Sequence, residues 1–220
     1  MAARGEASRV KLFYFDIRGK GAPIRWLAAQ TGIEFEDVRV KREEFHAMRD
    51  KGLTPFGQLP VAEFYDKDNN LLCRIAQMRA ILRYMARSSG NKGYSSDLAQ
   101  AAVIDSFLDF EEDVFNAMRS SIFPARIGLP EYASDEAKEA MRRKVAEEVL
   151  TPKLAYLIQA LENSKSGWIA GGDLSIADLA LGSSLMWLNG GVVDGVPAGY
   201  LDGKSPLLKE YIARFAAEFS

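Results

Sequence analysis

A strand, a helix and a second strand follow one another closely near the start of the chain, and their spacing constrains the fold more than any other feature. Residues 10–15 place apolar side chains on both faces of a strand, which is typical of a sheet covered on both sides. Gly19 and Gly21 end that strand, and Pro23 fits the first turn of a helix, where its missing N–H has no intrahelical partner. Residues 35–40 are predicted to form the next strand. Two strands joined in this way run parallel, so the sequence predicts a βαβ unit.

The rest of residues 10–87 completes a small α/β domain. Breaker residues indicate a loop over 54–60, and the turn chemistry of residues 66–70 indicates a hairpin. The expected order of elements is β-α-β-α-β-β-α. The remaining elements are a charged helix at Arg42–Lys51, strands at Val61–Tyr65 and Leu71–Ile75, and an amphipathic helix from Ala76 onward.

The second half of the chain is predicted to be helical throughout. Residues 88–97 are polar and glycine-rich, which is typical of a linker between domains. We therefore expect a first domain at residues 1–87 and an all-α domain at residues 98–220.

Three local patterns in the helical half predict structure and no chemistry. Pro152 is expected to kink or interrupt a long helix, because it lacks an N–H. Ser175 and Asp178 have the spacing of a helix capping box. The acidic cluster at residues 109–113 is expected to be solvated surface, because its carboxylates lack the isolated pairing that acid–base catalysis needs.

Composition argues against several classes of function. The formal net charge is −2 and no long Lys/Arg run occurs, so neither nucleic acid nor an anionic membrane surface is expected as a partner. No run approaches the ~20 apolar residues of a membrane span, and residues 1–9 lack the apolar core of a signal peptide, so a cytoplasmic location is expected. Cys73 is the single cysteine and His46 the single histidine, which argues against a disulfide, a His-based metal site and a catalytic triad.

Tyr14 stands where the first strand ends, beside the start of a helix. Open α/β sheets bind ligands at this edge, and a helix N-terminus favours anions. The phenol is therefore placed for chemistry. Strand and turn alone favour the alternative, in which Tyr14 is one more core aromatic, and the decision rests on the motifs elsewhere in the chain.

Those motifs resemble the cytosolic glutathione transferases over nearly the whole chain. Residues 14–20, Tyr-Phe-Asp-Ile-Arg-Gly-Lys, are similar to the family's Tyr-Phe-x-x-Arg-Gly-Arg. Gln58-Leu59-Pro60 is similar to the segment whose proline is cis in this family. Residues 77–84 are similar to the family's Gln-Ser/Thr-Arg-Ala-Ile segment. The tyrosine-type enzymes fit best, particularly the sigma and alpha classes, which implies a thioredoxin-like N-terminal domain, an all-α C-terminal domain and a homodimer.

The resemblance also implies roles for individual residues. Tyr14 would donate a hydrogen bond to the sulfur of glutathione and so favour the thiolate. Lys20 stands in place of the family arginine nearest the sulfur, with its charge kept and its planar fork lost, and Arg18 is the other basic candidate. The implied glutathione contacts are Phe45, Lys51, Gln58, Leu59, Pro60, Gln77 and Met78, and Asp105 would reach the partner subunit's glutathione. The implied electrophile pocket is lined by Phe13, Ile17, Met118 and Ile122.

Alternatives remain for several of these residues. Asp105 is equally well a surface carboxylate, and the four pocket residues are also ordinary core candidates. Met78 replaces the family's Ser or Thr, so either it weakens glutathione binding or it belongs to the apolar stripe of its helix.

The implied function is a detoxifying glutathione transferase that conjugates or isomerises small lipophilic electrophiles, with glutathione as co-substrate and no metal. Two alternatives are a non-catalytic binding or structural protein with this fold, and a glutathione-dependent isomerase of prostaglandin type. Tyr14 favours catalysis, whereas Met78 is the feature against it.

Overall fold

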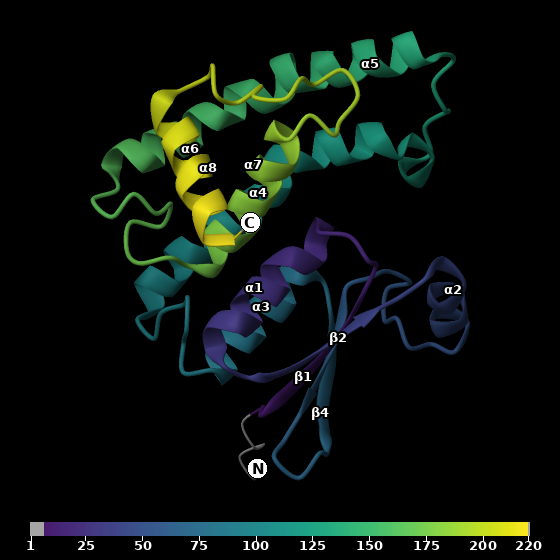
Figure 1. Cartoon of the computed structure of the whole chain (residues 1–220), viewed down its shortest axis with the longest axis vertical. Coiled ribbons are helices and arrows are strands. Elements are labelled where there is room, and N and C mark those ends of the chain that lie inside the picture. The colour runs from purple at the N-terminus through teal and green to yellow at the C-terminus, as the bar shows by residue number, and fades with distance from the viewer. Residues whose placement is uncertain (1–6, 220) are drawn as a thin grey trace. The chain divides into compact units, whose positions relative to one another are not determined.

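The computed structural model of this chain describes residues 7–219 (Figure 1). Residues 1–6 lie outside the described range. They make up most of the segment, residues 1–9, in which no signal peptide is predicted. The chain divides into two compact units, one up to Ala101 and one from Ala102 onward. No helix within residues 7–219 has the length and apolar character that a bilayer crossing requires.

The first unit is built on a four-stranded mixed sheet with strand order β2-β1-β3-β4. Strand β1 pairs parallel with β2 and antiparallel with β3, and β3 pairs antiparallel with β4. The predicted β-α-β-α-β-β-α order is confirmed. Its elements are β1 (Arg9–Tyr14), η1 (Gly19–Gly21), α1 (Ala22–Thr31), β2 (Glu34–Arg39), α2 (Arg42–Asp50), β3 (Val61–Tyr65), β4 (Leu71–Ala76) and α3 (Met78–Ser88).

Strand β1 alternates between a buried and a half-exposed face, which corrects the expectation of a sheet covered equally on both sides. Val10, Leu12 and Tyr14 are buried. Helices α1 and α3 pack against each other and against the sheet. On the opposite face, Lys11 forms an ion pair with Glu36 at 2.7 Å. Because paired charges cover this second face, it does not need a second layer of apolar packing.

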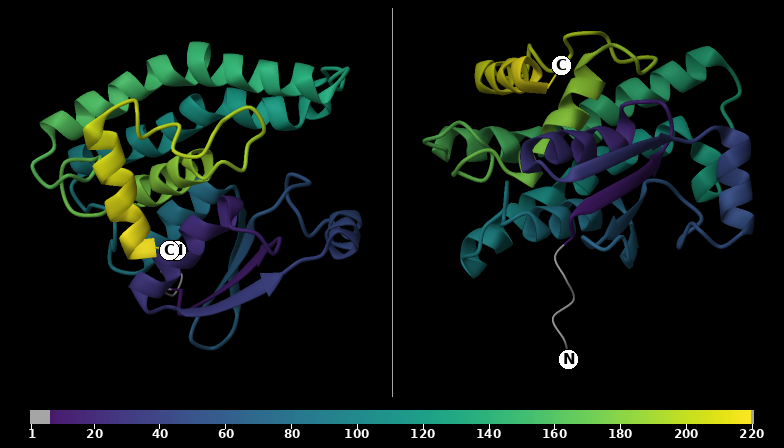
Figure 2. Two further views of the ribbon diagram at one scale, coloured as in Figure 1. Left: turned by 45° about the horizontal axis from the view of Figure 1, so that its top comes forward. Right: turned by 60° about the horizontal axis from the view of Figure 1, so that its bottom comes forward.

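The second unit is helical, as predicted. Helices α5, η3 and α6 form one long continuous path, which Figures 1 and 2 show from three directions. The expected interruption at Pro152 takes the form of η3, a π-helical segment that ends directly before Thr151. Helix α4 (Leu98–Ile122) begins in the last residues of the first unit and continues into the second. The elements after it are η2 (Pro124–Ile127), α5 (Asp135–Lys144), η3 (Val145–Leu150), α6 (Thr151–Asn163), α7 (Ile176–Asn189) and α8 (Pro206–Phe219).

The predicted acidic surface cluster on α4 is wrong for one member. Glu111 is fully buried, and its carboxylate accepts hydrogen bonds from the guanidinium of Arg119 and the hydroxyl of Ser184 on α7. Helical periodicity explains the error, because position 111 shares a face with the buried residues Leu108 and Phe115. The surface prediction rested on the cluster of neighbouring carboxylates and did not consider which helix face Glu111 occupies.

The predicted capping box at the start of α7 is confirmed, and its carboxylate also anchors other segments. Asp178 accepts the backbone N–H (2.9 Å) and hydroxyl (2.7 Å) of Ser175. It also accepts the N–H of Ile169 at 2.7 Å and the hydroxyl of Tyr211 on α8 at 3.1 Å. Burial raises the pKa of the Asp178 carboxyl, and these four hydrogen bonds oppose the rise. One side chain therefore joins α7, α8 and the segment before α7.

We expect Asp178→Asn to lower the free energy of unfolding by about 2–4 kcal/mol, because an amide nitrogen would face buried N–H donors. Urea denaturation measures the change. Asp173→Asn is the matched control, since Asp173 is exposed five positions earlier, and it should change the stability by less than about 0.5 kcal/mol. Equal effects of the two substitutions would contradict this role of Asp178.

Candidate active site

Tyr14 is the last residue of β1, and its side chain is 7% exposed. Its hydroxyl oxygen accepts a hydrogen bond from the backbone N–H of Lys20 at 3.0 Å. A phenol has one O–H donor and acceptor lone pairs on its oxygen. The bond from Lys20 uses a lone pair, so it fixes the oxygen without using the O–H. The structure thus holds a phenol in place by its acceptor side, at the edge of the sheet where strand β1 ends.

Two glycines allow the loop after β1 to wrap closely around the Tyr14 ring. Gly19 has a φ of +37°, and a Cβ there would lie 2.5 Å from the Tyr14 hydroxyl oxygen. A Cβ on Gly21 would lie 2.5 Å from Tyr14 Cδ1. Real Cβ atoms do not approach this closely, so any other residue would displace the ring or the loop.

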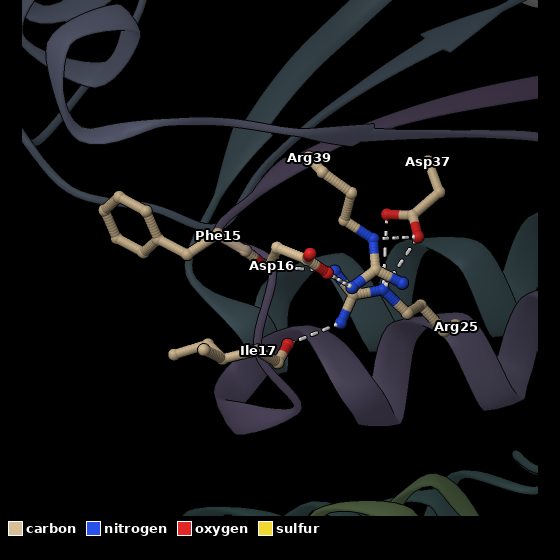
Figure 3. Close-up of polar contacts among 6 residues, drawn as sticks. All are labelled: Phe15, Asp16, Ile17, Arg25, Asp37 and Arg39. Carbon is tan, nitrogen blue, oxygen red and sulfur yellow. Dashed lines mark hydrogen bonds and ion pairs between the residues drawn. The ribbon is translucent and has the colours of Figure 1, made fainter.

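Charged side chains fasten the same loop to its neighbours (Figure 3). Arg25 of α1 donates to the backbone carbonyls of Ile17 at 2.9 Å and Phe15 at 3.4 Å. Its Nε also contacts both carboxylate oxygens of Asp37 on β2, at 3.2 and 3.1 Å. The loop between β1 and α1 is therefore tied to both α1 and β2.

An aromatic chain leads from Tyr14 to helix α2. The Tyr14 and Phe15 ring centroids are 5.8 Å apart, and those of Phe15 and Phe45 are 5.6 Å apart in an edge-on arrangement. Phe45 in turn lies 5.6 Å from the ring of His46. The structure thus connects two of the predicted site residues, Tyr14 and Phe45, through Phe15.

Two of the segments expected to bind glutathione, residues 58–60 and 77–78, are connected beside the start of α3. The Leu59–Pro60 peptide bond is cis, as the resemblance implied. The side-chain amide of Gln77 donates to the side chain of Gln58 at 3.4 Å. Gln77 immediately precedes α3, with φ +73° and ψ 116°. The N-terminus of α3 therefore opens next to the polar side chains of both glutamines, and such a terminus favours an anion.

Met78, the first residue of α3, points its side chain into the core. It is 5% exposed and continues the buried stripe of Ile81, Leu82 and Met85. This arrangement agrees with the alternative in which Met78 belongs to the apolar face of its helix. Met78 therefore contributes only its backbone N–H as a donor at the helix start.

The other predicted residues occupy varied positions. Lys51 is exposed directly after α2, Lys20 is half-buried in η1, and Phe13 is half-buried on β1. Ile17 is 56% exposed. In the second unit, Asp105 and Ile122 are half-buried on α4, whereas Met118 is fully buried and occupies a core position. Within residues 7–219, no group of three or more His, Cys, Asp or Glu side chains could hold a metal ion.

Arg25 and Asp37 are the site residues that sequence reasoning missed. Arg25 lies in the motif that carries the family resemblance, but its spacing gives no indication of a partner. Asp37 becomes that partner only through the parallel register of β1 and β2, in which Leu12 stands opposite Asp37. Register between strands is not readable from one sequence.

The domain models that match this chain cover both of its units. The model described as "Glutathione S-transferase, N-terminal domain" matches residues 10–87, and the one described as "Glutathione S-transferase, C-terminal domain" matches residues 125–219. Glutathione S-transferase 2 of Caenorhabditis elegans is 36% identical over 81% of this chain and 87% of its own length. Rat glutathione S-transferase alpha-4 is 30% identical over 94% of this chain and 83% of its own.

Solved structures agree with these relatives. The glutathione S-transferase of Ascaris lumbricoides has a TM-score of 0.70 and 31% identity, covering 96% of this chain and 98% of its own. A hookworm enzyme of Necator americanus, described as monomeric, has a TM-score of 0.71 and 28% identity, covering 95% and 92%. The sigma-class enzyme of Fasciola hepatica, 23% identical with a TM-score of 0.74 over 96% and 91%, shares the fold. The predicted family is therefore confirmed, and this chain belongs to the glutathione S-transferases.

Proposed function

We propose that this protein conjugates glutathione to small lipophilic electrophiles and that Tyr14 activates the thiol. The observation that carries the proposal is the Tyr14 hydroxyl, buried at the end of β1 and held by the Lys20 N–H at 3.0 Å. We propose that the O–H of this phenol donates to the sulfur of glutathione bound at the end of β1. The glutathione S-transferase relatives support this activity over a non-catalytic protein or a prostaglandin-type isomerase.

The chemistry follows from the acidity of thiols. A cysteine thiol has a pKa of about 8.5, so most free glutathione is protonated and weakly nucleophilic at neutral pH. A hydrogen bond from Tyr14 favours the thiolate, and lowering the thiol pKa by about 2 units needs about 2.7 kcal/mol. The thiolate then attacks an electrophilic carbon. A sulfur–carbon bond forms, and the leaving group departs with the bonding pair, or an activated alkene takes up a proton instead.

The proposed glutathione seat is the start of α3 and the loop before β3. Gln77 and the Met78 N–H are proposed donors to the anionic γ-glutamyl end, Gln58 or Lys51 is proposed at the glycyl end, and the backbone of Leu59 is proposed to pair with the cysteinyl part. Phe45 on α2 stays a proposed contact, Lys20 a proposed cation beside the sulfur, and Asp105 a proposed contact to the partner's glutathione.

The residues that line the electrophile pocket and the cellular location are also proposals. Phe13, Ile17 and Ile122 stay predicted lining residues, because each retains some exposure. The complete burial of Met118 favours its alternative role in the core. A cytoplasmic location also stays a prediction.

Tyr14→Phe tests the proposed function. We expect turnover to fall about 10- to 100-fold, because the hydrogen bond to the sulfur is lost. Glutathione affinity should stay nearly constant, since the tripeptide's ends are held elsewhere. The apparent pKa of the bound thiol should rise toward that of free glutathione. The measurements are calorimetric titration and a pH–rate profile with an aryl halide.

Tyr65→Phe is the matched control for that experiment. Tyr65 lies on β3 of the same sheet, and its hydroxyl donates to Glu63 at 2.6 Å, so this variant also loses one hydrogen bond. It should keep wild-type turnover. An unchanged pH–rate profile in Tyr14→Phe would show that another group activates the thiol.

Met78→Ser tests the seat at α3. A hydroxyl there adds a donor for the γ-glutamyl carboxylate, so glutathione should bind about three- to tenfold more tightly, with little change in turnover. The lost burial should lower the free energy of unfolding by about 1–3 kcal/mol. Met85→Ser, on the same buried stripe, should lower stability without tightening binding. Unchanged or weaker binding in Met78→Ser would place the carboxylate elsewhere.

A two-fold homodimer is also proposed. Phe56 is 65% exposed in the loop before β3, and the family resemblance places it where related chains insert an aromatic side chain into their partner. Light scattering should give twice the chain's 24.3 kDa. Phe56→Ser should shift the mass toward the monomer, whereas Tyr156→Ser, at 64% exposure in the second unit, should not. A single 24.3 kDa species in the wild type would overturn the dimer.

A further inference from the structure

We propose that Arg25, oriented by Asp37, is a positioning residue for Tyr14, so that it sets the acidity of the thiol without touching it. This inference rests on the proposed function, in which Tyr14 activates glutathione. Arg25 and Asp37 lie on different elements, α1 and β2, and meet at the loop that follows Tyr14 (Figure 3).

The first step concerns the backbone that Arg25 holds. Its two terminal nitrogens donate to the carbonyls of Ile17 at 2.9 Å and Phe15 at 3.4 Å. Phe15 and Ile17 bracket the first turn of the loop that leads to Lys20, whose N–H holds the Tyr14 oxygen. Because a guanidinium presents its donors in a rigid fork, one side chain fixes two carbonyls, two residues apart, in one geometry.

The second step concerns how Arg25 is itself oriented. Asp37 contacts its Nε with both carboxylate oxygens, and the two side chains are only 16% and 24% exposed. Asp37 also accepts from Arg39 Nε at 2.6 Å, and Arg39 reaches Asp16 at 2.8 Å. Asp16 is 84% exposed, so this outer pair contributes little. The inner pair of Arg25 and Asp37 carries the orientation.

The third step is the closeness of Arg25 to the phenol. The guanidinium carbon lies 5.7 Å from the centroid of the Tyr14 ring. A Cβ on Gly21 would lie 2.7 Å from Arg25 Nη1 and 2.5 Å from Tyr14 Cδ1, so both side chains pack against the same glycine. Loss of Arg25 therefore frees the loop and the ring together. A displacement of about 1 Å in a catalytic group can cost about a hundredfold in rate.

An arginine on the sheet itself, away from the loop after β1, separates positioning from simple stabilisation. Arg74 on β4 donates from Nε at 2.9 Å and Nη2 at 2.6 Å to Glu63. This pair is comparably shielded, with side-chain exposures of 30% and 11%. Among residues 7–219, neither Arg74 nor Glu63 forms a hydrogen bond or ion pair with the loop after β1. Arg74→Met therefore removes the same kind of ion pair away from Tyr14.

The experiment compares Arg25→Met, Arg25→Lys, Asp37→Asn and the control Arg74→Met with the wild type. Each protein is assayed for the pH dependence of kcat/KM, for the ultraviolet thiolate absorbance of bound glutathione, and for its melting temperature. Arg25→Lys keeps the charge and loses the fork, and it also serves if Arg25→Met does not fold. Asp37→Asn keeps the side-chain shape and removes the orienting charge.

We expect the apparent thiol pKa to rise by about one unit and turnover at neutral pH to fall about tenfold in Arg25→Met. Arg25→Lys should resemble Arg25→Met, because an ammonium does not reproduce the fork. In Asp37→Asn, turnover at neutral pH should fall about threefold or more. Arg74→Met should lose stability and keep the wild-type pH profile. An active wild type with unshifted profiles in the Arg25 and Asp37 variants would overturn this inference alone. A wild type that forms no glutathione conjugate would overturn the proposed function, and the inference with it.

Discussion

The close contact between the backbone of residues 19–21 and the Tyr14 ring is the constraint on which the rest of the site depends. Without a Cβ at Gly19 and Gly21, the loop approaches near enough for the Lys20 N–H to reach the phenol oxygen. The absence of a Cβ at Gly21 also leaves room for Arg25 beside the ring. The loop has little apolar burial of its own, because Asp16 and Ile17 are exposed. Hydrogen bonds therefore hold its geometry: those from Arg25 to its carbonyls, and backbone bonds such as that from the Gly21 N–H to the Arg18 carbonyl at 3.1 Å.

Sequence reasoning succeeded where the determining signal is local. The strand at Val61–Tyr65, the hairpin after it and the capping box of α7 depend on alternation, turn residues and one side chain's spacing, and all are present. It failed for Glu111, which was predicted to lie on the surface. Hydrogen bonds from Arg119 and Ser184 stabilise its buried carboxylate inside the helical unit. The Arg25 and Asp37 pair was missed for the same reason. A buried charge depends on partners that only the tertiary fold supplies.

Met78 illustrates how one position serves packing and binding by separate atoms. Its thioether side chain completes the buried stripe of α3, while its N–H stays at the helix start. A hydroxyl side chain in that place would serve the ligand better and the core worse. The predicted departure from the family pattern is thus a choice between two uses of one side chain, and the backbone donor is common to both.

The backbone of Gln77 provides independent support for a ligand at the start of α3. Its φ of +73° with ψ of 116° lies outside the conformations that a residue with a Cβ favours. Such a conformation costs on the order of 1–3 kcal/mol, and it persists only where the surrounding structure imposes it. Here the buried Met78 on one side and the buried end of β4 at Ala76 on the other fix the chain at both ends of the residue. Strain of this kind gathers at ligand sites. The exposed Gln77 side chain, directed to Gln58, therefore stays a proposed contact of glutathione at this helix start.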